Sequence, residues 1–236
     1  MAVTVYWACL EKEWIKANEP EKVIARFHKR GIKHEDINDL NAINQCPVFN
    51  SSLKNIYAIK SIYDYSFNIV ENGCTSSYYD QDFFNNHVVV RSLEKKFFSF
   101  FVQYIFFTEE DDLEMSAYQY PIFEENKITE RCIMIPGKFN IGKYFRNLEF
   151  PFILKKDFNE FIVNQEDVMY YLQFHTNKNI KFKQFIMNED LLKIMSDVRK
   201  VNHFSKNIKT NSIDIFYNKF KGKKYILNKI KENLLD

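Results

Sequence analysis

The chain has 236 residues, of which 46% are hydrophobic, enough to form one packed domain or one domain with an appendage. Its formal net charge of +2 is too small to point to nucleic acid or to a membrane surface as a partner of the whole molecule. The four cysteines form no Cys-x-x-Cys or short Cys/His pair, which favours reduced thiols over a zinc site. No secretory signal pattern is present, so we expect a protein of the cytoplasm.

Aromatic residues make up 17% of the chain, while Gly and Pro number only five each. Many ring side chains and few breakers favour extended strands that are joined by polar Asn, Asp and Ser turns. The first expected strand is Val3–Cys9. A helix is then expected over residues 18–31, because Pro20 would stand in its first turn and Gly31 follows its basic end.

From Tyr63 onward, apolar and polar residues alternate, and Asn72-Gly73 predicts the turn of a β-hairpin. Further strands are expected at short intervals, in residues 87–92, 97–108, 113–120, 131–136, 148–155, 168–176 and 180–187. This spacing fits an antiparallel β-sandwich, a jelly roll or a small barrel better than alternating βαβ units.

The pattern becomes helical at Asn188, which stands as a cap before two acidic residues. From Arg199 onward, ten Lys or Arg residues face only three Asp or Glu residues. We therefore expect a mainly β (α+β) protein. It consists of a β-rich domain over residues 1–187, with its short N-terminal strand and helix, and a basic helical appendage over residues 188–236.

One stretch, KKFFSFFVQYIFFTEEDDLEM (residues 95–115), sets an almost unbroken apolar run between lysines and acids. The run is about half of the roughly 20 residues needed to cross a bilayer, so no membrane span is expected. Both faces are apolar, which predicts a central strand. The acids after it do not match a calcium loop and are interpreted as a solvated turn.

Two of the five histidines are placed on predicted strands, and with one carboxylate they form the candidate ligand set His87, Glu149 and His175. In a jelly roll, such a set is typical of a non-haem iron oxygenase. The usual His-x-Asp/Glu pair is missing, which favours structural histidines and no cofactor. No nucleophile elbow or phosphate loop appears, and residues 135–143 are expected to be a loop.

The basic C-terminal segment interleaves lysines with aromatic residues, and its candidate partner-binding residues are Lys219, Lys221, Lys223, Lys224 and Tyr225. Such segments grip phosphates and stack on bases, which would make this arm a nucleic-acid site. The interpretation that we favour is that the aromatic side chains dock the arm on the body while the lysines stay in water. An acidic protein surface is a third possible partner.

Four stretches carry a resemblance to a known group of proteins: YDQDFFNNHVVVRS, FFTEEDDLEMSA, RCIMIPGKFNIGKYFRNLEFPFILKK and YYLQFHT. Through them the chain resembles uncharacterised proteins of marine T4-like tailed phages of the cyanophage type, over about Val5 to Met187. The strands around EFPF are also faintly similar to a bacterial domain of unknown function. The resemblance implies a viral origin and transfers no activity.

We therefore expect a phage-encoded binding or structural protein without catalytic activity, which docks to a viral or host protein in the host cytoplasm or in the virion. The first alternative is a cupin-like enzyme that uses iron. The second alternative is nucleic-acid binding through the C-terminal arm.

Overall fold

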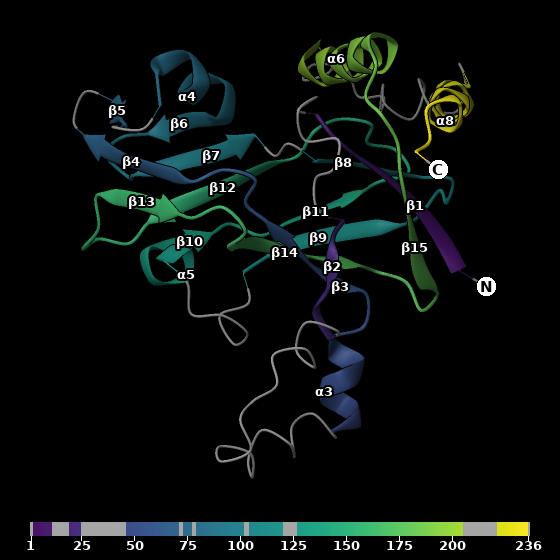
Figure 1. Cartoon of the computed structure of the whole chain (residues 1–236), viewed down its shortest axis with the longest axis horizontal. Coiled ribbons are helices and arrows are strands. Elements are labelled where there is room, and N and C mark those ends of the chain that lie inside the picture. Colours follow the sequence, from purple (N-terminus) through teal and green to yellow (C-terminus); the bar gives the residue numbers. More distant parts are fainter. Residues whose placement is uncertain are drawn as a thin grey trace.

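The computed structural model describes residues 2–10, 19–24, 46–70, 73–76, 79–101, 104–119, 127–204 and 221–235. Within these ranges the protein is mainly β, with strands in four sheets and few helices (Figure 1). Almost all neighbouring strands are antiparallel, as the hairpin and turn signals predict. The predicted fold class is confirmed at this level.

The first sheet has the order β15-β1-β8 and is built from Asn179–Gln184, Ala2–Cys9 and Tyr104–Thr108. The predicted N-terminal strand is confirmed as β1, which pairs parallel with β15 and antiparallel with β8. One face of this sheet, including Trp7 and Phe106, enters the main core. The opposite face packs under helices that come from the C-terminal part of the chain.

Two further sheets face each other through phenylalanine rings. One has the order β10-β12-β7-β6, built from Cys132–Met134, Glu149–Leu154, Phe97–Phe101 and Val88–Ser92. The other has the order β13-β4-β5, built from Glu160–Val163, Tyr65–Val70 and Gly73–Thr75. The Phe67 and Phe161 rings of the second sheet lie 5.3 and 5.2 Å from the Phe98 ring of the first. These edge-to-face contacts lie in the centre of the main core.

The fourth sheet has the order β11-β9-β14-β3-β2, built from Gly137–Asn140, Glu114–Tyr118, Val168–Phe174, Ile56–Lys60 and Glu21–Lys22. Its inner face joins the main core, and its outer face buries Ile56 and Ala58 under Leu53 and Val23. Leu53 ends the short helix α3 (Pro47–Ser52), which begins directly after Cys46. Figure 1 shows α3 beyond the end of β3 and β2.

The predicted helix over residues 18–31 is wrong at its start. Glu21 and Lys22 lie in strand β2, opposite Ala58 and Tyr57 of β3, so Pro20 stands before a strand rather than in the first turn of a helix. Residues 25–31 lie outside the described residues. Strand pairing is favoured over a helix at these residues because the neighbouring Val23 side chain is buried against β3 and β14.

The predicted hairpin is confirmed, with Val70 of β4 opposite Gly73 of β5. The long apolar stretch is not one central strand. It forms β7 and β8, which end and begin on either side of residues 102–103 and belong to different sheets. Residues 137–140, predicted as a loop, form strand β11. Both faces of β8 are buried, one in the main core and one under the C-terminal helices, whereas β7 buries Phe98 and Phe100 and leaves Phe97 and Phe101 half-buried on its other face.

Two short helices complete the β-rich part, α4 (Gln81–His87) and α5 (Lys127–Arg131). Helix α4 was not predicted, although its sequence carries a start signal. The Asp80 carboxylate accepts a 2.8 Å hydrogen bond from the Phe83 amide, and Phe84 and His87 turn inward one turn apart. His87 therefore ends a helix rather than beginning strand β6.

The helices expected after Asn188 are present as α6 (Glu189–Phe204) and α8 (Gly222–Glu232). The Asn188 side chain caps α6 through a 2.9 Å bond from the Leu191 amide. Leu191, Ile226 and Ile230 are buried against Tyr6, Ile105 and Phe107 on the outer face of the first sheet. The helices thus share a core with the β-rich part, and Figure 1 shows both beside β1 and β8. Among the described residues, no helix has the length and apolarity to cross a membrane.

Candidate functional site

His87 occupies a buried aromatic environment. Its Nδ1 atom lies 2.7 Å from the Phe83 carbonyl oxygen, within the same helix. The Phe83 ring stacks on the imidazole at 4.0 Å, and the Tyr63 ring meets it edge-on at 5.4 Å. The residue is only 4% exposed. A backbone bond and ring packing are the environment of a structural histidine rather than of an open metal ligand.

The other two candidate ligands have separate partners. Glu149 forms an ion pair with Arg91 across strand β7. His175 is exposed, and its Nε2 atom lies 2.7 Å from the Ser116 hydroxyl oxygen on the neighbouring strand β9. In the part of the chain that the structure describes, no three His, Cys, Asp or Glu side chains gather as a metal site would require. The predicted set of His87, Glu149 and His175 is therefore not brought together.

The acidic turn after β8 forms the docking site of helix α8. The Lys223 ammonium lies 2.6 Å from an Asp111 carboxylate oxygen and 3.1 Å from the Glu110 carbonyl oxygen. Lys231 pairs with Glu109 at 2.7 Å, and the Tyr6 hydroxyl donates to the same carboxylate at 2.9 Å. The interpretation of this turn as merely solvated is incomplete, because its acids neutralise the lysines of the C-terminal helix.

These contacts shift the titration of the groups involved. The hydrogen bond from Lys231, followed by that from Tyr6, lowers the pKa of Glu109 below its ordinary value. The hydrogen bond from Lys223 does the same to the pKa of Asp111. Burial, followed by the bond to Glu109, raises the pKa of Tyr6 to about 12. Both carboxylates are therefore held in the charged form that keeps α8 docked.

The predicted arm residues divide into two groups. Lys223 points to the acidic turn, whereas Lys221, Lys224 and Tyr225 are exposed, Tyr225 to 54%. Lys219 lies outside the described residues. The predicted docking through aromatic side chains is wrong for Tyr225, which stays in water while Ile226 and Ile230 carry the packing. The aromatic residues of the arm before residue 221 lie outside the described residues. Two ammonium groups and a phenol ring therefore remain on the outer side of the helix.

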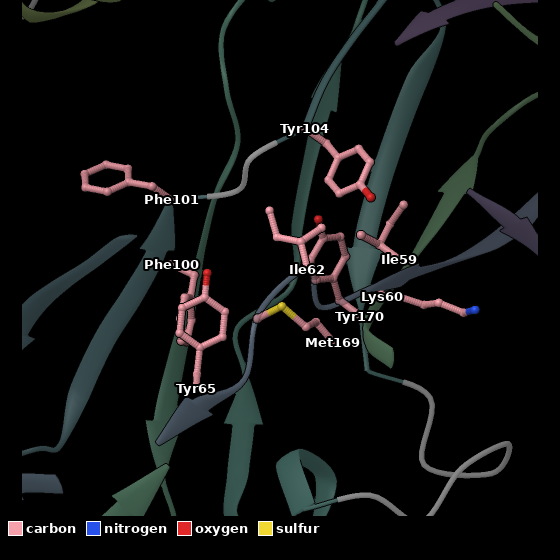
Figure 2. Close-up of a pocket in the computed structure, with 9 residues that line it drawn as sticks. All are labelled: Ile59, Lys60, Ile62, Tyr65, Phe100, Phe101, Tyr104, Met169 and Tyr170. Atoms are coloured by element: carbon pink, nitrogen blue, oxygen red, sulfur yellow. The ribbon is translucent and has the colours of Figure 1, made fainter. Parts of the chain in front are cut away.

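A small cavity lies where β7 ends and β8 begins (Figure 2). Strands of all four sheets contribute to its walls, and its lining residues are Ile59, Lys60, Ile62, Tyr65, Phe100, Phe101, Tyr104, Met169 and Tyr170, which Figure 2 labels. Its volume is about 30 Å³. That is room for about one water molecule, whereas ligand pockets span roughly 300–1,000 Å³. The cavity in this form is too small for a substrate.

Tyr170 adds a buried hydroxyl group to the lining of this cavity. Its ring packs on Phe150 with 4.4 Å between centroids, and its hydroxyl finds no hydrogen-bond partner among the described residues. Burial, and then the nearby Tyr104, raise the pKa of Tyr170 well above its ordinary value. At the rim, the Lys60 ammonium pairs with Glu166 at 3.0 Å. The sequence could not reveal this cavity, because its walls come from strands far apart in the chain.

The outer face of the β10-β12-β7-β6 sheet exposes aliphatic side chains. Ile133 is 54% exposed and Ile135 is 37% exposed. Ile133 lies opposite Ile153, which lies opposite Phe97, so the three form one row on a single face. Arg91 of β6 lies beside Phe97 and forms an ion pair across β7 with Glu149 of β12. We call the surface formed by Ile133, Ile135, Ile153 and Phe97 the aliphatic face. The sequence did not predict it, because RCIMIP and LEFPFILK predict strands without showing which side of each strand is covered.

A comparison with protein-family models and with curated proteins finds no significant match to this chain.

Proposed function

We propose that this protein is a phage-encoded binding or structural protein of β-sandwich or jelly-roll type, which docks to another protein of the virus or host without catalysing a reaction. It would act in the host cytoplasm or in the virion. The observation that carries this proposal is the aliphatic face, where Ile133 and Ile135 stay in water beside half-buried Ile153 and Phe97.

A protein surface of complementary shape is the partner that fits this face best. Grouped aliphatic side chains on an otherwise polar surface mark sites of association, because their burial is worth about 25 cal/mol for each Å² removed from water. The row of Ile133, Ile153 and Phe97 lies on paired strands that hold its shape. The Arg91–Glu149 ion pair, which crosses β7 next to this row, supplies charged groups of the kind that such interfaces carry beside an apolar centre.

The test compares a double substitution on the aliphatic face with a single substitution at an exposed aliphatic residue elsewhere. The variant Ile133→Lys/Ile135→Lys places charges on the aliphatic face, and Val48→Lys places one on α3, where Val48 is 77% exposed. Binding to purified virion proteins and to fractionated host proteins is measured for both. We expect the first variant to bind its partner at least about tenfold more weakly and the second to bind as the parent protein does. Equal binding of both variants, with unchanged circular dichroism, would contradict the proposal.

A second candidate function, nucleic-acid binding, is favoured by the exposure of Lys221, Lys224 and Tyr225. Binding through these groups would release counterions, so affinity for short DNA or RNA would fall steeply with salt. Lys224→Ala/Tyr225→Ala would abolish that binding, while Lys138→Ala, which changes an exposed lysine of β11, would preserve it. Binding that is insensitive to salt would contradict this second function.

A further inference from the structure

Strand β15 forms one edge of the β15-β1-β8 sheet. The Phe185 amide, directly after β15, donates to the Trp7 carbonyl of β1 at 2.9 Å. The backbone groups of Gln184 and Ile186 point the other way, because the Gln184 carbonyl accepts from Leu235 and the Ile186 amide donates to Asn233, both at 2.9 Å. Successive residues of β15 therefore alternate between the β1 side and the outer edge.

This alternation shows which backbone groups lie on the outer edge. Lys181 and Lys183 direct their amides to β1, as Phe185 does, whereas Ile180 and Phe182 direct theirs away from it. At one end of the edge, Leu234 pairs antiparallel with Phe185. Across the ranges that the structure describes, no strand pairs with the edge at Ile180 or Phe182. The edge thus already pairs with one antiparallel residue at Phe185. Its backbone groups at Ile180 and Phe182 are not paired with any described strand.

The side chains of β15 differ sharply between its two faces. Ile180 and Phe182 pack against the main core, whereas Asn179, Lys181 and Lys183 are exposed. The structure records no ion pair at Lys181 or Lys183 with any described residue, while Lys178 just before them pairs with Glu110 at 3.0 Å. Two neighbouring ammonium groups on one face therefore lack carboxylate partners of the kind that Lys223 and Lys231 of α8 have.

We propose that the outer edge of β15 binds an extended acidic segment of a partner protein, which adds to the sheet as an antiparallel strand. The main chain of the segment would bond to Ile180 and Phe182, and carboxylates at alternate positions would neutralise Lys181 and Lys183. Its intervening apolar residues would lie on the face of Ile180 and Phe182. A second copy of this edge does not fit, because lysines would then oppose lysines.

This surface is separate from the aliphatic face and needs neither Ile133 nor Ile135. Lysines on an edge strand also have a simpler role, which is to prevent pairing with any other strand. The two roles lead to different behaviour towards an acidic peptide. Binding of a synthetic eight-residue peptide of alternating Glu and Val to the full chain distinguishes these two roles.

The main readout is amide hydrogen exchange by NMR. In the protein alone, we expect the Ile180 and Phe182 amides to exchange at least about tenfold faster than those of Lys181 and Lys183, which bond to β1. The Glu/Val peptide should slow exchange at Ile180 and Phe182. The same peptide with N-methyl groups along its bonding edge should not, because it cannot donate to the strand. Slow exchange at Ile180 and Phe182 without peptide would overturn the proposal.

Charge reversal supplies the second readout. Lys181→Glu/Lys183→Glu should weaken binding of the Glu/Val peptide by about 3- to 10-fold and permit binding of a Lys/Val peptide, because exposed attractive ion pairs become repulsive. Lys54→Glu, which changes an exposed lysine outside the proposed binding surfaces, is the matched control and should leave both affinities unchanged. Absence of peptide binding, or equal weakening by the control, would also overturn the proposal.

Discussion

At the scale of single residues, Tyr170 and Tyr6 offer opposite cases of a tyrosine hydroxyl. The Tyr170 hydroxyl is buried without a partner among the described residues, while the Tyr6 hydroxyl donates to Glu109 at 2.9 Å. We expect Tyr170→Phe to leave the free energy of unfolding within about 1 kcal/mol of the parent value or to raise it, and Tyr6→Phe to lower it by about 1–2 kcal/mol. Urea unfolding measures both. A larger loss in Tyr170→Phe than in Tyr6→Phe would contradict this account.

Gly142 is a second residue whose role depends on its surroundings. A Cβ atom at this position would collide with the Glu110 carbonyl oxygen, whereas a Cβ atom at Gly137 would meet nothing within 4 Å. We expect Gly142→Ala to lower the free energy of unfolding by about 1–3 kcal/mol, because the backbone beside the acidic turn must shift. Gly137→Ala is the matched control and should cost less than about 0.5 kcal/mol. Thermal unfolding of the two variants makes the comparison, and equal losses would contradict it.

At the scale of elements, the docking of α8 depends on pH. Lysines lower the pKa of both Glu109 and Asp111 in the folded protein. A lowered carboxyl pKa adds stability above the ordinary carboxyl range, and this stability is lost as the pH falls through the folded value. The free energy of unfolding should therefore decrease as the pH falls below about 5, through the ordinary carboxyl pKa range and on through the lower folded values.

Lysine substitutions isolate the contribution of α8. Removing the two charges with Lys223→Met/Lys231→Met should make the decrease at low pH smaller, because the carboxylates then titrate nearer their ordinary range. Lys224→Met, on the exposed side of the same helix, should leave the decrease unchanged. Urea unfolding at a series of pH values checks both variants, and an identical pH dependence in all three proteins would contradict the role of the acidic turn.

Local sequence signals predicted most of the elements. The hairpin at Gly73, the strand at Val3–Cys9 and the helix capped by Asn188 all depend on short-range turn, pattern and cap chemistry. Helix α4 could have been predicted in the same way, from Asp80 followed by an inward pair one turn apart. The break between β7 and β8 could not, because a stretch that is apolar on both faces carries no signal of where it leaves one sheet for another.

At the scale of the whole molecule, long-range contacts decided what the pattern left open. His87, Glu149 and His175 lie on predicted elements, but only the folded sheets show that each has a separate partner. The charge of the C-terminal segment predicted a basic arm. It could not predict where on the β-rich part that arm is attached. That attachment joins α8 to an acidic turn more than a hundred residues earlier, and residues at such separation share no local pattern.

Across the whole molecule, the aliphatic face differs from the other apolar faces of the sheets, which makes it the central feature of the proposed function. Two other apolar faces of the described chain are covered, since the C-terminal helices bury the outer face of the first sheet, and Leu53 and Val23 cover part of the fourth. Ile133 and Ile135 are exposed on a face that no comparable apolar cluster buries in the described part of the chain. A binding site for another protein would explain why this apolar face is exposed while the others are covered.

Site-specific photo-crosslinking tests this claim most directly. A photoreactive phenylalanine analogue replaces Ile133 on the aliphatic face in one protein and Val48 on α3 in another, and each is irradiated with virion and host proteins. We predict that the reagent at position 133 joins the chain to one discrete viral or host protein and that Ile153→Asp abolishes this product, while position 48 gives none. The same products from both positions, or no product from position 133, would contradict the account.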